Sequence, residues 1–473
     1  MYLVYEEVKG TCVASGRGII SRLSFILQRF MLQPPRSYQL YQIANILHSL
    51  HLGSYPVGIG CSLNCHGWWA RLGLNQRPLA CEASALPLSY APMQLKAGVS
   101  ETPGVLSSEL FSELDFPGCW VSCKLQKIKI VGDHMPFDIG VMLRGQYAFD
   151  VDMVAMAEDL IEQARMADRL GYASITKGSH YSTPDYQALQ QLPLLARLTG
   201  EVKNARLNAG VVLLPLHKPL DVAEQFATMD VISNGRMILG VGIGYRDVEL
   251  KAFGTAMKER GKRANESLIA IKRLWTEDVV SMKGSHFYLD EAVCWPKPIQ
   301  KPYPPIWIGA NADVALKRAV EHGDCWYINP HTTITTLDRQ VEIYRRMLDE
   351  ADKPFPKEFP MRREAFVAPT RDEAVRLAGP FVSKKYASYH GTGQSDQLPE
   401  GETLAGGFEE LVGDRFLIGS PDDVVEQMID INKRLGVNHL ILSMEWAGMD
   451  KAVAMDCMQL MAEEVIPQVK SAV

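Results

Sequence analysis

Polar side chains follow several apolar runs in the second part of this chain. His180 ends "SITKGSH", Arg144 follows "FDIGVML", and Glu445 and Trp446 follow "HLILSM". An imidazole both donates and accepts protons near neutral pH, so His180 is the leading candidate for catalytic chemistry. Arg144, Glu445 and Trp446 are candidates for a substrate pocket, together with Ser179 beside the histidine.

Backbone groups offer a second kind of site. In "WIGANAD", Ala310 and Asn311 stand where a helix pattern begins, and the free N–H groups of a helix start bind anions. "LGVGIGY" holds the alternating glycines Gly240, Gly242 and Gly244. These glycines either let a flat ring approach the backbone or relieve crowding inside a barrel, and the residues alone leave both explanations open. They do not form a dinucleotide-binding fingerprint, because they lie within and at the end of a fourth strand.

Strand and helix patterns alternate from Phe137 to the end of the chain. Eight apolar runs are typical of strands, and helical spacing follows them, as in "MVAMAEDLIEQARMADRLGY". This alternation implies parallel pairing, and eight repeats in about 338 residues predict an α/β fold of the (β/α)8 TIM-barrel type. An open doubly wound sheet is the alternative. The carboxyl ends of barrel strands meet at one face, so the polar residues above should share one mouth.

Two segments interrupt the regular pattern. "DYQALQQLPLLARLTG" is predicted as one helix, with Pro193 as a local irregularity. Residues 391–416 are polar and rich in glycine, which indicates either a mobile lid that excludes water from the site or a disordered insertion.

The first 134 residues differ from the rest. They carry 11 Lys and Arg against 8 Asp and Glu, whereas the remainder carries 38 against 47, and they show no sustained helical or strand period. The stretch ending "SALPLSYAP" resembles a sequence found at the front of conceptually translated bacterial open reading frames that read through a tRNA gene. We therefore expect residues 1–134 to be a poorly structured extension, largely a mis-called start, with the natural protein beginning at Met135. A genuine extension is the alternative.

Composition excludes several classes of protein. The chain is 47% hydrophobic and 22% charged, which supports a sizeable core and argues against wholesale disorder. Its net charge is −6 and its basic residues are scattered, so no nucleic-acid partner is expected. No run of about 18 apolar residues predicts a membrane span. The first residues lack the pattern of a signal peptide, which indicates a cytoplasmic protein.

Cysteine spacing gives weak evidence for a metal. Cys61 and Cys65 are separated by three residues, as are Cys119 and Cys123, and His66 would complete a zinc site. The spacings are loose and no regular element frames them, so we predict no metal site.

The block from "LNAGVVLLPLHKP" to "GVGIGYRDVELKAFG" closely resembles the bacterial luciferase-like family of flavin- and deazaflavin-dependent oxidoreductases. "PPIWIGANADVALKRAVEHGD" and "FLIGSPDDVVEQM" are similar to the same family, and the resemblance covers about residues 136–473. It implies a luciferase-like TIM barrel with reduced FMN lying across its mouth.

The resemblance also implies cofactor contacts on two strands. Strand three of the family commonly carries a non-proline cis peptide beneath the flavin ring, and the matching pair is Gly210–Val211. Ile243, Gly244 and Tyr245 would then lie near the ring and the ribityl chain.

The resemblance places Arg263 at the position of the family's phosphate ligand, and Ala310 and Asn311 would add hydrogen-bond donors. Arg246 is expected to face solvent or a dimer partner. Relatives often have His-His or Asp-His followed by an aromatic residue, whereas this chain has Ser179 before His180. The aldehyde chemistry of the luciferases is therefore not expected.

The resemblance implies an FMN-dependent monooxygenase that acts on a small organic substrate. It further implies a separate flavin reductase as the source of reduced FMN, and a homodimer. One alternative is hydride transfer with F420, and a second is a non-catalytic flavin-binding protein. The eight intact repeats argue against the second alternative.

Overall fold

The computed structural model describes residues 113–116, 119–122, 137–178, 180–391 and 393–473. The chain divides into two units, residues 1–133 and 134–473, and each is described by itself. In the first unit, β1 (Glu113–Phe116) pairs with β2 (Cys119–Ser122) as an antiparallel hairpin. The predicted start at Met135, the predicted pocket residue Ser179 and most of the possible zinc ligands lie outside the described residues.

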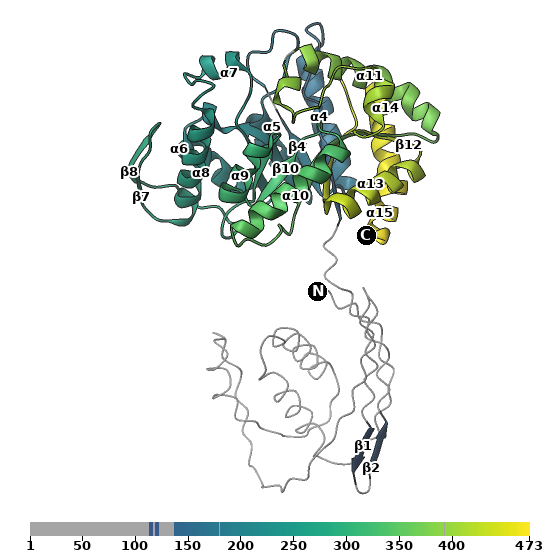
Figure 1. Cartoon of the computed structure of the whole chain (residues 1–473), viewed down its shortest axis with the longest axis horizontal. Helices are drawn as coiled ribbons and strands as arrows, with labels where there is room; N and C mark the ends of the chain where they lie inside the picture. Colours follow the sequence, from purple (N-terminus) through teal and green to yellow (C-terminus); the bar gives the residue numbers. More distant parts are fainter. Residues whose placement is uncertain (1–112, 117–118, 123–136, 179, 392) are drawn as a thin grey trace. The chain divides into compact units, whose positions relative to one another are not determined.

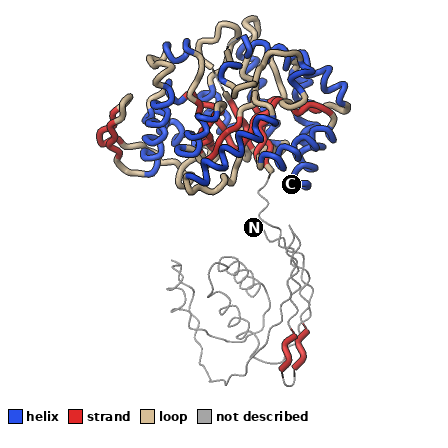
Figure 2. The backbone as a smooth tube through the Cα atoms, in the orientation of Figure 1, coloured by secondary structure: helices blue, strands red, loops and turns tan. Residues whose placement is uncertain are grey.

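The second unit contains a closed barrel of eight parallel strands (Figures 1 and 2). These strands are β3 (Asp138–Met142), β4 (Ser174–Lys177), β5 (Arg206–Leu213), β6 (Met237–Gly242), β9 (Ile306–Ala310), β10 (Cys325–Ile328), β11 (Pro360–Val367) and β13 (His439–Ser443). The ring closes where β10 meets β11 through the pair Ile328–Met361. The predicted TIM barrel is therefore confirmed, and the open doubly wound sheet is wrong.

Helices surround the strands, as Figure 2 shows. The main ones are α4 (Met153–Arg169), α5 (Gln191–Glu201), α6 (Pro219–Ile232), α8 (Arg260–Thr276), α9 (Asp313–His322), α10 (Ile334–Glu350), α11 (Arg371–Gly391), α13 (Pro421–Leu435), α14 (Lys451–Leu460) and α15 (Ile466–Ala472). Their limits follow local chemistry, because Asp152 and Ser420 accept hydrogen bonds from first-turn N–H groups and Gly436 ends α13 at a φ of 76°. No helix among the described residues is both long and apolar enough to cross a membrane.

Apolar side chains form separate clusters on the two faces of the barrel strands. A large cluster includes Leu440 and Leu442, whereas Ile441 between them belongs to a small cluster with Trp307 and Tyr327. Neighbouring residues of a strand point to opposite faces. The large cluster therefore joins strands to helices, and the small one fills the barrel interior.

Several short elements were not predicted from the sequence. They are α7 (Asp247–Ala252), α12 (Phe408–Val412), β12 (Leu417–Gly419) and a hairpin of β7 (Val280–Lys283) with β8 (Tyr288–Ala292). The prediction of one helix from Asp185 is wrong, because α5 begins at Gln191. Pro193 thus lies in the first turn, where its missing N–H removes no helical hydrogen bond.

Residues 391–416 are folded against the barrel over their described part. Leu398, Leu404 and Leu411 are buried in the large cluster. Arg415 donates to a Glu402 carboxylate oxygen at 2.5 Å and to the His331 carbonyl at 2.8 Å. A disordered insertion is therefore wrong, whereas a lid movement stays a prediction.

Candidate active site

Several of the predicted site residues lie in the last half of a barrel strand or just after its carboxyl end. Arg144 follows β3, His180 follows β4, Gly210 lies in the second half of β5, and Tyr245 follows β6. In a parallel barrel these ends share one mouth. The topology thus brings together residues that are up to about 300 positions apart in the chain, since Arg144 pairs with Glu445.

The peptide bond between Gly210 and Val211 is cis, as predicted. The pairing of β5 with β6 is irregular at this point, between Ala209 and Val212. A Cβ on Gly210 would lie 2.7 Å from Thr176 Cγ2 and 2.9 Å from the amide nitrogen of the Asn208 side chain. A side chain at this position would require movement of its neighbours, so the packing favours glycine.

The glycines of β6 have a structural explanation. A Cβ on Gly240 would lie 2.5 Å from the Ala209 carbonyl oxygen, and one on Gly242 would lie 2.6 Å from Val211 Cγ2. Both glycines therefore relieve crowding against the irregular part of β5. Gly244 is different, because its φ of 74° is a conformation that other residues rarely adopt.

His180 is held by a buried carboxylate. Its Nδ1 lies 3.0 Å from Glu249 Oε1, and the Tyr181 N–H donates to the same oxygen at 2.8 Å. Burial raises the pKa of Glu249, but the hydrogen bond and charge of His180, with the Tyr181 N–H and Arg246, outweigh it and leave the pKa below its usual value. The ionised carboxylate thus favours the proton on Nδ1, which leaves Nε2 for a ligand.

Two residues of this arrangement were misjudged from the sequence. Glu249, on α7, was not predicted, because the burial of a single glutamate has no local signal. Arg246 was expected to face solvent or a partner, and its side chain is only 14% exposed. Its guanidinium donates to the Tyr181 carbonyl at 2.9 Å and to the Ser182 carbonyl at 3.0 Å, so it fixes the loop after β4.

A cluster of aromatic rings lies beside this loop. The ring of Tyr181 lies 4.7 Å from that of Phe253, and His217 lies about 6 Å from both. On the other side, the edge of Tyr245 is 5.9 Å from the His180 ring. Aromatic rings therefore lie on both sides of the histidine, whose own side chain is 27% exposed.

Arginines gather at the start of α8. Arg260 donates to the Gly244 carbonyl at 2.6 Å, and Arg318 of α9 donates to the Asn265 side chain at 2.6 Å. A Cβ on Gly261, next to Arg260, would lie 2.9 Å from Arg318 Nη2, so Arg318 reaches the start of α8. Burial lowers the pKa of Arg318, and the charge of Arg260 lowers it further. The guanidinium of Arg263 makes no hydrogen bond or ion pair with any described residue. The predicted phosphate ligand is therefore available, and Arg260 and Arg318 were missed.

The carbonyl groups just before α9 already accept hydrogen bonds from side chains. The Ala310 carbonyl accepts from the Trp326 indole at 3.0 Å, and the Asn311 carbonyl accepts from Gln340 at 2.8 Å. Asp313 already places a carboxylate in the first turn, where Arg339 pairs with it. An anion here would depend on the neighbouring arginines as well as on the helix.

The predicted pocket residues after β3 and β13 contact each other. Arg144 forms an ion pair with Glu445, whose other oxygen accepts from Gln163 at 3.0 Å. Trp446 is 3% exposed, and its indole N–H donates to Glu364 at 2.7 Å. Arg144 and Glu445 thus neutralise each other at the mouth, whereas Trp446 mainly supports a residue of β11.

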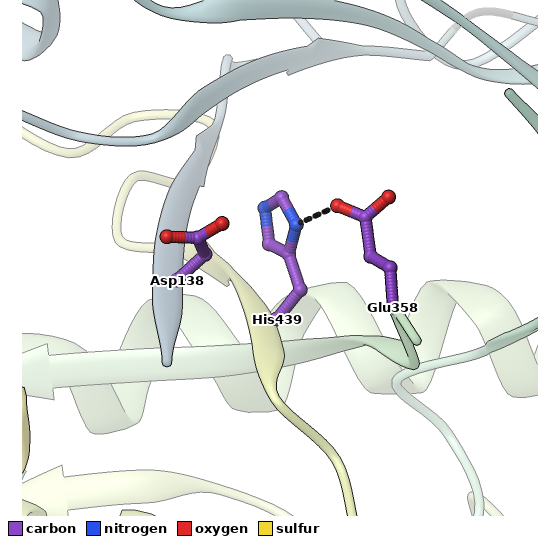
Figure 3. Close-up of side chains that lie close together, drawn as sticks. All are labelled: Asp138, Glu358 and His439. Carbon is purple, nitrogen blue, oxygen red and sulfur yellow. Dashed lines mark hydrogen bonds and ion pairs between the residues drawn. The ribbon is translucent and has the colours of Figure 1, made fainter. Parts of the chain in front are cut away.

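A second polar cluster lies at the opposite end of the barrel. Figure 3 shows His439, the first residue of β13, between Asp138 and Glu358, and potential ligand atoms of all three lie within 4.8 Å of one another. The two ring nitrogens of His439 already bond to Glu358 and to the Ser174 hydroxyl, each at 2.8 Å. Arg206 also donates to Glu358, at 2.5 Å. These bonds make the cluster a hydrogen-bond network that joins strand starts.

The chain resembles known proteins in sequence and in structure. The sequence model of the luciferase-like monooxygenase family matches residues 137–439. The oxygenase component of a flavin-dependent trigonelline monooxygenase from Acinetobacter baylyi is 29% identical over 223 residues, covering 46% of this chain and 61% of the relative. An F420-dependent glucose-6-phosphate dehydrogenase from Amycolatopsis mediterranei is 30% identical over 311 residues, covering 60% and 87%. The chain thus spans less than two thirds of the first relative and most of the second.

A crystal structure of a monooxygenase from Streptomyces bottropensis has the same fold. The TM-score is 0.62 at 23% identity, and the match covers 70% of this chain and 99% of that one.

Proposed function

The chain belongs to the luciferase-like monooxygenase family, and we propose that it uses reduced FMN and molecular oxygen to oxygenate a small organic substrate. One observation carries this proposal: the His180–Glu249 pair and the glycine of β5 lie at adjoining strand ends. A Cβ on Gly178, two residues before His180, would lie 2.9 Å from the Gly210 carbonyl oxygen. A flat ring bound over Gly210–Val211 would therefore lie beside a histidine that a buried carboxylate orients.

The residues at the mouth fit FMN. Gly210 lets β5 pack closely against Thr176 and Asn208 beneath the proposed ring. Ile243, Gly244 and Tyr245 follow the end of the neighbouring strand β6. Arg263, with Arg260, offers unpaired positive charge for a phosphate. Reduced flavin supplies the electrons that oxygen activation needs, and the protein supplies position and exclusion of water.

His180 is the residue that we assign to proton handling. Glu249 holds its Nδ1 at 3.0 Å, so Nε2 is the nitrogen that can hold or deliver a proton at the reacting atom. Tyr181, His217 and Phe253 form a cluster of aromatic rings on that side of the loop.

Hydride transfer with F420 is a second candidate, and the similarity to the F420-dependent dehydrogenase over 87% of its length supports it. A non-catalytic flavin-binding protein is less well supported, because all eight strands are present. A flavin reductase partner, a homodimer and a cytoplasmic location also belong to this proposal and rest on the family and on the sequence pattern. The same holds for a functional domain of residues 135–473.

Anaerobic titration of the full chain with reduced FMN and with reduced F420 tests the cofactor. Tighter binding of FMN, followed by transfer of isotopically labelled oxygen into an organic product, is the expected result. Tighter binding of F420 would replace oxygenation with hydride transfer, and binding of neither by a folded chain would refute both.

Substitution of the histidine tests its role. We expect His180→Gln to keep FMN binding and to lower product formation by about 10²-fold or more, the usual contribution of a general acid or base. His322→Gln, in the last turn of α9, is the matched control and should leave turnover unchanged. Equal effects of the two changes would remove His180 from the chemistry.

A further inference from the structure

The mouth of the barrel holds more buried positive charge than its carboxylates can balance. Arg362 and Glu364 of β11 point to the same face of the strand, because they are two residues apart. Glu364 is fully buried, and its two oxygens are already bound, by Lys385 at 2.7 Å and by the Trp446 indole at 2.7 Å. The Glu364 carboxylate is therefore paired mainly with the Lys385 ammonium.

The guanidinium of Arg362 has mainly neutral partners. Its Nε–H donates to the Ser443 hydroxyl at 3.0 Å, and the Tyr389 hydroxyl also bonds to it. The distance from Arg362 Nη2 to Glu364 Oε1 is 3.8 Å, which is too long for a hydrogen bond. Arg362 thus forms only a long ion pair with Glu364, which is closer to Lys385.

Lys177 adds a third cation at the end of β4. It is fully buried, and its ammonium donates to the Gly178 carbonyl at 2.9 Å. Burial, followed by the charge of Arg362, lowers the pKa of Lys177 to about 8. Arg362, Lys385 and Lys177 together exceed the single carboxylate of Glu364 by two charges. Burial of cations that their carboxylate does not fully neutralise is costly, so this surplus calls for an anion.

A buried hydroxyl without a hydrogen-bond partner among the described residues lies near Arg362. Tyr327 of β10 is 5% exposed, and its hydroxyl is buried without a hydrogen-bond partner in the described part of the chain. Burial raises the pKa of Tyr327 to about 12 while the charge of Arg362 opposes this, so the hydroxyl keeps its proton beside the guanidinium. A buried donor with no acceptor costs free energy that a ligand oxygen would recover.

We propose that Arg362, Lys177 and Tyr327 bind a carboxylate of the substrate. Arginine binds a planar carboxylate through two parallel N–H groups, and a phenol adds a third donor. The inference rests on the proposed function, because it takes the mouth as the substrate site. It narrows the substrate class to small organic acids, with the carboxylate held on the β10–β11 side and the reacting atom directed toward His180.

Binding of two probe molecules to the full chain tests the site. Benzoate carries the charge and benzamide has nearly the same shape without it. The Trp307 ring is 5.5 Å from that of Tyr327, so tryptophan fluorescence should report binding. We expect benzoate to bind about tenfold or more tightly than benzamide, the effect of one charge-assisted hydrogen bond. Equal affinities would refute the proposal.

Substitutions test which residues cause the preference for benzoate over benzamide. Arg362→Gln and Tyr327→Phe should each remove most of it, with benzamide binding unchanged. Arg376→Gln removes an exposed arginine of α11 whose side chain is 69% exposed, and it should keep the full preference. Tyr327→Phe removes one atom only, so it covers the case in which the Arg362 variant does not fold.

Cofactor binding separates this proposal from the proposed function. Unchanged FMN affinity in both variants supports a substrate site, whereas a loss of FMN affinity with an intact benzoate preference would assign these residues to the cofactor and overturn the inference. If wild-type chain binds neither FMN nor F420 but still prefers benzoate, the proposed function fails while the carboxylate site stands.

Discussion

Replacement of Glu358 by glutamine should weaken the fold in a manner that depends on pH. Glu358 binds His439 at 2.8 Å and Arg206 at 2.5 Å, at the end of the barrel away from the mouth. Burial raises its pKa, but the His439 hydrogen bond and the charge of Arg206 outweigh this and lower the pKa to about 2. The ionised carboxylate is therefore stabilised by the folded state.

The magnitude follows from that shift. The unfolded pKa is about 4.5, and each unit of difference corresponds to about 1.4 kcal/mol, so the folded state gains up to about 3 kcal/mol at neutral pH. Because the folded pKa is the lower one, this gain is complete above about pH 4.5 and disappears as the pH falls toward 2. The glutamine variant should lack it at every pH.

Urea denaturation of the full chain provides the assay, with Trp307 as a local probe because its ring is 5.2 Å from that of His439. We expect wild type to exceed Glu358→Gln by about 2–3 kcal/mol at pH 7, with a difference that shrinks below pH 4. Glu342→Gln, on the exposed face of α10, should change little. A difference that is the same at pH 7 and pH 3 would show that packing, rather than charge, is responsible.

Three further substitutions follow from the mouth of the barrel. Gly242→Ala should lower the free energy of unfolding by about 1–3 kcal/mol in urea denaturation, because its Cβ would lie 2.6 Å from a Val211 methyl group. The control is Gly200→Ala, in α5 with open space around it, which should be neutral or stabilising. Equal effects of the two changes would refute the crowding argument. Glu249→Gln should cost about 2–4 kcal/mol and lower turnover, since a buried carboxylate with three donors is lost; unaltered stability in the same assay would mean that these bonds contribute little. Lys177→Met should be more stable than wild type by up to about 3 kcal/mol at pH 7, because the folded pKa of about 8 lies below the usual 10.5; the advantage should fade between pH 8 and 10.5, and its persistence at pH 11 would contradict the assignment to charge.

The sequence predicted the barrel because its signal is repeated and local. Eight apolar strands such as "HLILS", each followed by an amphipathic helix, leave few other architectures. The glycines near β5 and β6 were noticed for the same reason. Their explanation required the structure, since the atoms that crowd Gly240 belong to another strand.

Charged residues of the site were the least predictable part. Nothing in the local sequences "GYRDVE" and "PMRREAFV" distinguishes Glu249 and Arg362 from surface residues. Only their neighbours in the folded structure make them buried. Arg246 was assigned to the surface because most arginines lie there. A strand that carries three consecutive charged residues, as β11 does at 362–364, was the available signal, because such a strand can be buried only where partners exist.

The closure of the barrel gives the carboxylate site a thermodynamic consequence. β10 and β11 meet through Ile328 and Met361, whereas β11 pairs with β13 along five residues. Arg363 strengthens this junction, because its guanidinium binds the carbonyls of Asn329 and Thr332 just beyond β10. A ligand held by Tyr327 of β10 and Arg362 of β11 would connect the same two strands. Substrate binding and closure of the ring are then linked equilibria, in which each favours the other.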